Sequence, residues 1–119
     1  MKVEQIMELE EGDVVDEHVD FWRTTLPEGF NIAKGVTFNW DVYFFEATLP
    51  KGFTIAEGVT FNGYVSFYKA NLPKGFTISK GVTFGGNFDF WRATLPNDFN
   101  IPDNTIIELR LYYKNTKVI

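Results

Sequence analysis

Four aromatic residues recur at intervals of 23 positions and are the most distinctive candidates for a binding site in this chain. They are Trp22, Phe45, Tyr68 and Trp91, and each lies between a phenylalanine and a charged residue. Aromatic side chains bordered by charges are typical of the anchor residues of protein interfaces. The column therefore predicts a surface that binds another protein or a second copy of the chain. The alternatives are rings that pack against the edge of their own fold or stack on each other, and rings that stack on carbohydrate.

The acidic N-terminal segment is the second candidate. Residues 1–18 carry a net charge of −6, whereas residues 19–119 carry +1. Glu8, Glu10 and Glu11 form the densest part of this charge. Carboxylates of this kind can hold a hard cation, although the spacing lacks the EF-hand pattern, or can imitate nucleic-acid phosphates and occupy a basic site on a partner. We favour a solvated cap, because repeat arrays need a polar terminal surface.

The composition leaves little room for catalysis. The chain has no cysteine and one histidine, His18, which excludes thiol nucleophiles, disulfides and most histidine-based chemistry. Asp20 and Asp89 lie three repeats apart, about 14 Å at strand spacing, which is too far for a glycosidase pair. No basic stripe favours direct nucleic-acid binding. We therefore predict a protein that is not an enzyme, with no catalytic residue, no metal site and no cofactor.

An internal repeat organises the elements that position these residues. The segment LPKGFTIxxGVTF begins at Leu26, Leu49 and Leu72 with small variations, and a decayed copy begins at Leu95. A fixed period of 23 residues without insertions indicates a repeat array. Eight apolar columns per coil are interleaved with polar residues in short pieces such as Val-Thr-Phe, which is the period of a β-strand. Stacked coils should pair equivalent strands in parallel, about 4.8 Å apart.

Two glycine columns mark the turns of each coil. In the fourth copy, Asp98 replaces Gly29, Gly52 and Gly75, and Asn104 replaces Gly35, Gly58 and Gly81. Because Asp and Asn tolerate positive φ better than other non-glycine residues, both columns are predicted to be left-handed. Trp40 faces Gly63 and Gly86 in a third column, and we expect it to cover the bare backbone of the following coil, with a binding role as the alternative.

The two ends of the chain differ from the repeats. The spacing of Val3, Ile6 and Met7 is compatible with a short helix near residues 2–10. Residues 105–119, TIIELRLYYKNTKVI, alternate apolar and polar side chains and predict one long closing strand. Its charged residues fit an edge that avoids uncontrolled pairing.

The repeat columns, LPxGFxIxxGVTFxGxVxFxxAx, resemble the short leucine-rich-repeat-like β-solenoids of small bacterial and phage proteins. Such coils carry an LP turn, a glycine-containing turn and an LxL-type strand, and the resemblance covers Val19 to Ile119. It implies a solenoid fold and no particular activity, because one scaffold hosts many functions. By analogy with small phage and mobile-element proteins that block host defence complexes, an inhibitor of a host protein complex is a narrower expectation.

These observations together predict an all-β protein, a parallel β-helix-like solenoid of about four coils. Residues 1–18 form its acidic cap and residues 19–119 its repeat domain. We expect a protein-binding module, with a self-assembling structural unit as the alternative. The predicted partner-binding residues are Trp22, Phe45, Tyr68, Trp91, Glu8, Glu10 and Glu11. With no signal peptide and no apolar run of about 18 residues, a cytoplasmic location without membrane contact is expected.

Overall fold

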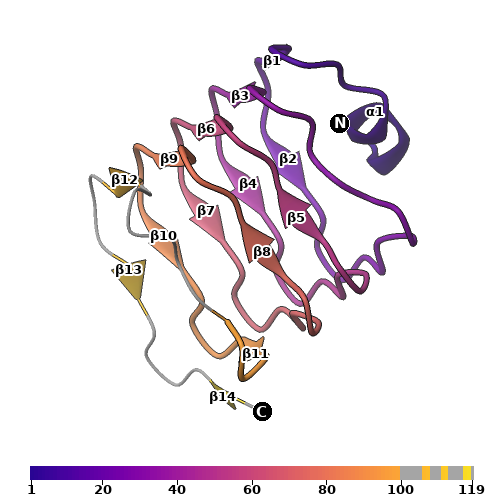
Figure 1. Cartoon of the computed structure of the whole chain (residues 1–119), viewed down its shortest axis with the longest axis vertical. Coiled ribbons are helices and arrows are strands. Elements are labelled where there is room, and N and C mark those ends of the chain that lie inside the picture. Colours follow the sequence, from indigo (N-terminus) through magenta and orange to yellow (C-terminus); the bar gives the residue numbers. More distant parts are fainter. Residues whose placement is uncertain (100–105, 108–110, 113–116, 119) are drawn as a thin grey trace.

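The fold is a β-solenoid in which the chain winds in coils of 23 residues and equivalent strands pair in parallel (Figure 1). The computed structural model describes residues 1–99, 106–107, 111–112 and 117–118. A short helix, α1 (Val3–Met7), covers the N-terminal end. Nothing helical in this described part has the length and apolar character of a membrane span.

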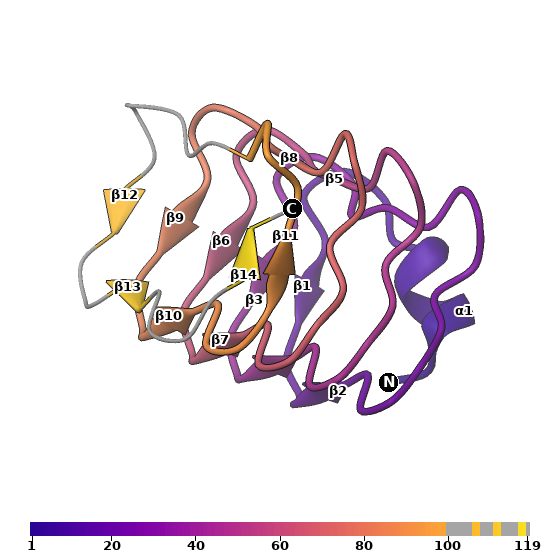
Figure 2. The same ribbon diagram turned by 90° about the horizontal axis from the view of Figure 1, so that it is seen from below.

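Two large sheets lie on different sides of the solenoid (Figure 2). The first contains, in spatial order, β1 (Val14–Val15), β3 (Thr37–Phe38), β6 (Thr60–Phe61), β9 (Thr83–Phe84) and β12 (Ile106–Ile107). The second contains, from one edge to the other, β2 (Val19–Asp20), β4 (Val42–Tyr43), β7 (Val65–Ser66), β10 (Phe88–Asp89) and β13 (Leu111–Tyr112). Two smaller parallel pairs complete the coil: β5 (Thr54–Ile55) with β8 (Thr77–Ile78), and β11 (Thr94–Leu95) with β14 (Lys117–Val118).

The register confirms the predicted stacking of equivalent residues. Ile55 pairs with Ile78 between β5 and β8, one repeat further along the chain. The rings of Phe44 and Phe67 stack with centroids 4.6 Å apart and an interplanar angle of 4°. This separation is close to the spacing of paired strands, so the side chains of one column meet directly across the coils.

The core consists of the predicted apolar columns, which are buried along the described repeats. Phenylalanine rings form continuous stacks inside it. The ring centroid of Phe61 lies 5.2 Å from that of Phe38 and 5.3 Å from that of Phe84, and the ring planes of each pair are 7° apart. No coil can bury its apolar face alone, so each coil depends on its neighbours for stability. At the N-terminal end, Ile6 of α1 is buried in the same core.

The left-handed turn positions agree only in part with the prediction. The six glycines of the two columns have φ between 68° and 83°. Asp98 has no positive φ, so the inference drawn from that replacement is wrong, and Asn104 lies outside the described residues. A further left-handed column was not foreseen, and it consists of charged residues, with φ between 53° and 58°: Arg23, Glu46, Lys69 and Arg92.

The C-terminal segment contains three short strands in place of one long closing strand. They pair with three different strands: β12 with β9, β13 with β10, and β14 with β11. Ile107, Leu111 and Val118 thereby take the same positions as Phe84, Phe88 and Leu95 of the preceding coil. Alternating hydrophobicity alone cannot distinguish one long strand from short strands that pair in different sheets, whereas the repeat columns can.

Candidate functional site: an aromatic groove

The candidate site lies on the outer face of the second sheet. Side chains alternate along a strand, so Val65 and Phe67 point into the core while Tyr64, Ser66 and Tyr68 point outward. The same alternation in each coil places the column of Trp22, Phe45, Tyr68 and Trp91 on this face. We call the hollow between these residues the aromatic groove.

Local hydrogen bonds hold three of the four aromatic residues of the column in place: Trp22, Tyr68 and Trp91. The side chain two positions earlier accepts from each backbone N–H: Asp20 Oδ1 from Trp22 at 2.9 Å, Ser66 Oγ from Tyr68 at 3.2 Å, and Asp89 Oδ1 from Trp91 at 3.1 Å. Short polar side chains commonly stabilise turns in this way. The chain turns at the aromatic column, just after β2, β4, β7 and β10 of the second sheet.

The left-handed residues that follow the aromatic column are held by backbone bonds between coils. The N–H of Arg23 donates to the carbonyl oxygen of Phe45 at 2.9 Å, and that of Glu46 donates to Tyr68 at 2.8 Å. Such conformations are unfavourable for residues with a Cβ and persist where surrounding contacts fix them. The same bonds set the register between one aromatic ring and the next.

Five rings line a groove of about 340 Å³: Trp22, Phe45, Tyr64, Tyr68 and Trp91. Neighbouring rings are turned against each other, with 89° between Phe45 and Tyr68 and 65° between Tyr68 and Trp91. Trp22 and Trp91 are 57% and 44% exposed, as an outward column requires, whereas Phe45 and Tyr68 are half-buried. The column is thus open at its ends and packed in its middle.

The floor of the groove is polar and buried. The side chains of Ser66 and Asp89 are 0% and 3% exposed. The Asp89 carboxylate accepts hydrogen bonds from the Tyr64 hydroxyl and from Ser66 Oγ, the latter at 3.1 Å, in addition to the Trp91 N–H. Burial of a charged group requires such partners. The small serine between larger residues leaves the hollow above it.

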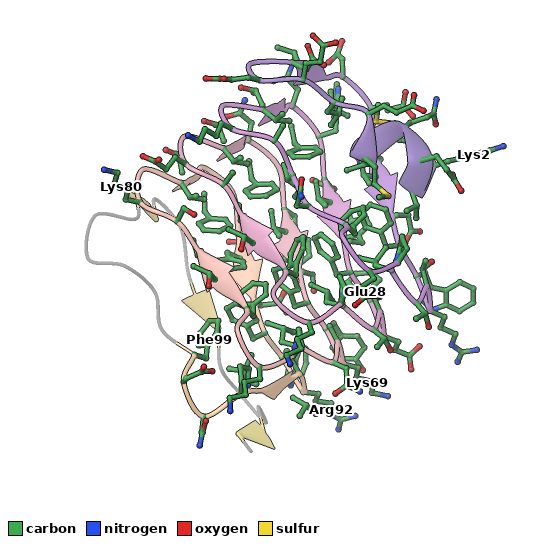
Figure 3. The ribbon with its side chains drawn as sticks, turned by 45° about the vertical axis from the view of Figure 1, so that its right-hand side comes forward. Lys2, Glu28, Lys69, Lys80, Arg92 and Phe99 are labelled. Atoms are coloured by element: carbon green, nitrogen blue, oxygen red, sulfur yellow. The ribbon has the colours of Figure 1, made fainter. Side chains whose placement is uncertain are left out.

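Charged side chains border the groove. Arg23 Nε donates to Glu46 Oε2 at 3.0 Å, and this hydrogen bond lowers the pKa of the Glu46 carboxyl below its ordinary value. The Arg23 guanidinium also lies 4.9 Å from the centroid of Trp22, and Lys69 Nζ lies 5.5 Å from that of Tyr68. Figure 3 shows Lys69 and Arg92 extending from the same edge of the solenoid, and Lys80 on a distant part.

Tyr43 supports the groove from beside Phe45. Their rings stack with centroids 4.7 Å apart. The Tyr43 hydroxyl donates to Asp41 Oδ2 at 2.6 Å. This hydrogen bond and, to a smaller extent, burial raise the pKa of Tyr43 to about 12. The phenol is therefore neutral at physiological pH and acts as a hydrogen-bond donor.

The acidic candidates do not join the aromatic groove. Glu8, Glu10 and Glu11 are all exposed, and none of them lines it. Within residues that the structure describes, no group of three or more acidic or histidine side chains is arranged to hold a metal ion. The three carboxylates form a solvent-facing surface beside α1.

A charge ladder on another face was missed by the sequence analysis. Glu57 lies between two lysines of the neighbouring coils, with Lys34 Nζ at 3.9 Å and Lys80 Nζ at 3.6 Å from its carboxylate oxygens. With Glu11 the column alternates in sign at every repeat. The signal in the sequence is the alternation of acidic and basic residues at a spacing of 23 positions. Exposed pairs contribute little stability, at most about 1 kcal/mol each, but like charges here would oppose stacking.

Trp40 is placed differently from the expectation. Its Nε1 donates to Asp16 Oδ1 at 3.0 Å, and its ring lies 5.5 Å from that of His18. The side chain thus turns to the preceding coil and not to the following one, and it is 50% exposed outside the aromatic groove. The backbone of the following coil lies close to the backbone of Trp40. A Cβ added at Gly63 would be only 2.7 Å from the Trp40 carbonyl carbon.

The fold and the groove are described from the structure of this chain alone. No family model, no curated protein and no solved structure matches the chain.

Proposed function

We propose that the chain is a protein-binding module and that the aromatic groove receives the partner. The observation that supports this most strongly is the row of aromatic side chains across four coils, with Trp22 and Trp91 about half exposed at its ends. Single exposed apolar side chains are ordinary on protein surfaces, whereas a contiguous aromatic row marks an interaction site. Trp and Tyr are also the residues most often found at the energetic centre of interfaces.

The size of the groove indicates its role in an interface. Large aromatic side chains bury about 150–250 Å² each, so the half-exposed pair and the partly open middle rings offer on the order of 300 Å². A stable interface buries about 800 Å² on each partner. The groove therefore acts as an anchor within a larger contact surface, and the bordering charges of both signs, on Arg23, Glu46 and Lys69, orient the partner.

The acidic surface of Glu8, Glu10 and Glu11 is a second contact region in this proposal. It is exposed and belongs to residues 1–18, the segment that carries the excess negative charge of the chain. Contacts made through it should weaken as salt is added, because dissolved ions screen the attraction between exposed charges, largely beyond about 10 Å at 0.1 M ionic strength. Reversal of these three charges to lysine should reduce salt-sensitive binding while leaving groove-dependent binding in place.

A narrower version of the proposal makes the partner a host protein complex that the chain inhibits. The resemblance of the repeat columns to small bacterial and phage solenoids is its support. Identification of the captured protein decides between this role and a general adaptor role.

The alternative, self-assembly, is favoured by one separate observation. β1 is an edge strand of the first sheet, and Val14 within it is exposed. An edge strand with an exposed apolar side chain is a template for pairing with another chain. Light scattering after size exclusion tests this: a stable dimer that Val14→Lys dissociates would establish assembly through β1, and a monomer at all concentrations would exclude it.

Capture of partners from a lysate of the native host tests the proposed function. We expect Trp22→Ser combined with Trp91→Ser to abolish capture, since these rings are the exposed part of the groove and contribute little to the core. Trp40→Ser is the matched control, because it removes an equally exposed tryptophan outside the groove. Capture that survives in the double variant, or that is lost equally in the control, contradicts the proposal. Circular dichroism and the melting temperature establish that each variant is folded.

A further inference from the structure

We propose that the aromatic groove binds the side chain of an arginine presented by the partner protein. This inference rests on the proposed function and specifies the chemical group that the groove recognises. It is carried by three features of the groove: the orientation and exposure of its rings, the sign of the charges that line it, and the carboxylate acceptor at its border.

The rings are arranged around a hollow and do not form a platform. Phe45 and Tyr68 are nearly perpendicular, and Trp91 is turned by 65° from Tyr68. A row that stacks on successive sugar units would present rings in one plane, so this geometry disfavours extended carbohydrate. The outer rings, Trp22 and Trp91, are about half exposed, and the faces of exposed aromatic rings attract cations.

The charge of the lining has the matching sign. Glu46 and Asp89 supply the carboxyl groups of the lining, of which Glu46 already pairs with Arg23 at 3.0 Å, and neither lysine nor arginine is among the lining residues. Arg23 and Lys69 stand outside the lining, against the rings of Trp22 and Tyr68. These contacts show that the rings already attract cations from solvent-exposed side chains. A partner cation inside the hollow contacts more rings than Arg23 or Lys69 does. It is also more shielded from water, which strengthens the cation–π attraction.

The polar groups favour a guanidinium over an ammonium group. The planar guanidinium stacks on aromatic rings and has five N–H donors in a fixed plane, whereas the ammonium is compact and strongly hydrated. The accessible acceptor is the Glu46 carboxylate at the border of the groove, because the buried Asp89 and Ser66 oxygens at the floor already accept hydrogen bonds from within the chain. An arginine can stack on a ring and donate to Glu46 at the same time, as Arg23 does beside Trp22.

The test uses short acetylated peptide amides, Gly-Arg-Gly and its citrulline counterpart, which has nearly the same shape without the charge. Trp40→Phe protein leaves Trp22 and Trp91 as its tryptophans, so fluorescence reports from the groove. We expect saturable binding of the arginine peptide, about two- to thirty-fold tighter than the citrulline peptide, as a cation–π contact provides. A Gly-Lys-Gly peptide should bind more weakly than the arginine peptide.

Two variants locate the binding. Glu46→Gln should reduce the preference for arginine over citrulline, whereas Glu57→Gln, which removes an exposed carboxylate outside the groove, should leave it unchanged. Equal binding of the two peptides, absence of binding, or an equal effect of both variants would overturn the inference. If partner capture still depends on Trp22 and Trp91 in that case, the proposed function stands without the arginine; if it does not, both fail.

Discussion

Replacement of Phe67 by alanine removes a ring from the middle of the aromatic core. The side chain is fully buried, and its ring centroid lies 4.6 Å from that of Phe44 and 5.1 Å from that of Phe90, in the coils on either side. Phe76 and Phe88 contact it at 5.8 and 5.9 Å. The substitution therefore leaves a cavity that touches three consecutive coils.

The expected cost follows from this environment. A buried Phe→Ala change lowers the free energy of unfolding by about 3–5 kcal/mol, and four aromatic neighbours place Phe67 at the upper end, since each pair contributes about 0.5–1.5 kcal/mol beyond its area. A domain of this size has a total stability of about 5–15 kcal/mol. We expect the melting temperature to fall by about 10–25 °C.

Urea unfolding followed by circular dichroism measures the change, and Phe21→Ala is the matched control. Phe21 is buried in the same column, but its ring contacts a neighbouring coil on one side only, through Phe44 at 5.1 Å. We expect about half the cost of Phe67→Ala. If the two substitutions cost the same, or if Phe67→Ala costs less than about 1 kcal/mol, coil-to-coil ring stacking is not what stabilises the fold.

Two further predictions concern the backbone and the titration of a phenol. Gly86→Ala should lower the urea midpoint strongly while Gly85→Ala is tolerated, because an added Cβ would lie 2.4 Å from the Gly63 carbonyl oxygen in the first case and no nearer than 3.5 Å to any atom in the second; equal midpoints would refute the close approach of the coils. Tyr43 should ionise near pH 12 in a spectrophotometric titration, because its hydrogen bond to Asp41 raises its pKa. Its contribution to stability is fully present below pH 10, the ordinary value, and is lost as the pH rises through 12; a titration that Tyr43→Phe leaves unchanged would contradict this.

The fold could be predicted because the period of 23 residues carries most of the structural information. A solenoid buries equivalent residues above one another, so columns such as Ile55 and Ile78 reveal the register without any knowledge of the turns. The turns themselves were harder to predict. Arg23 and Glu46 adopt positive φ, which their residue types disfavour, because hydrogen bonds from the next coil hold them there.

The candidate site could be predicted only as a column of residues. The sequence indicates that Trp22 and Trp91 face outward, but it cannot show that the intervening rings turn perpendicular to each other. Nor does it show that Ser66 leaves a hollow above the buried Asp89 carboxylate. The small size of Ser66 in a column with Asp20, Tyr43 and Asp89 was the one available signal. The pairing of rings and carboxylates arises from tertiary packing, which pattern analysis does not describe.

Fluorine NMR of protein labelled with fluorotryptophan tests the central claim most directly. The chain has three tryptophans, of which Trp22 and Trp91 line the aromatic groove and Trp40 does not. Single Trp→Phe variants assign the resonances. On addition of the captured partner, we predict that the signals of Trp22 and Trp91 shift or broaden while that of Trp40 is unchanged. A complex in which Trp22 and Trp91 are unaffected would contradict the assignment of the groove as the binding surface.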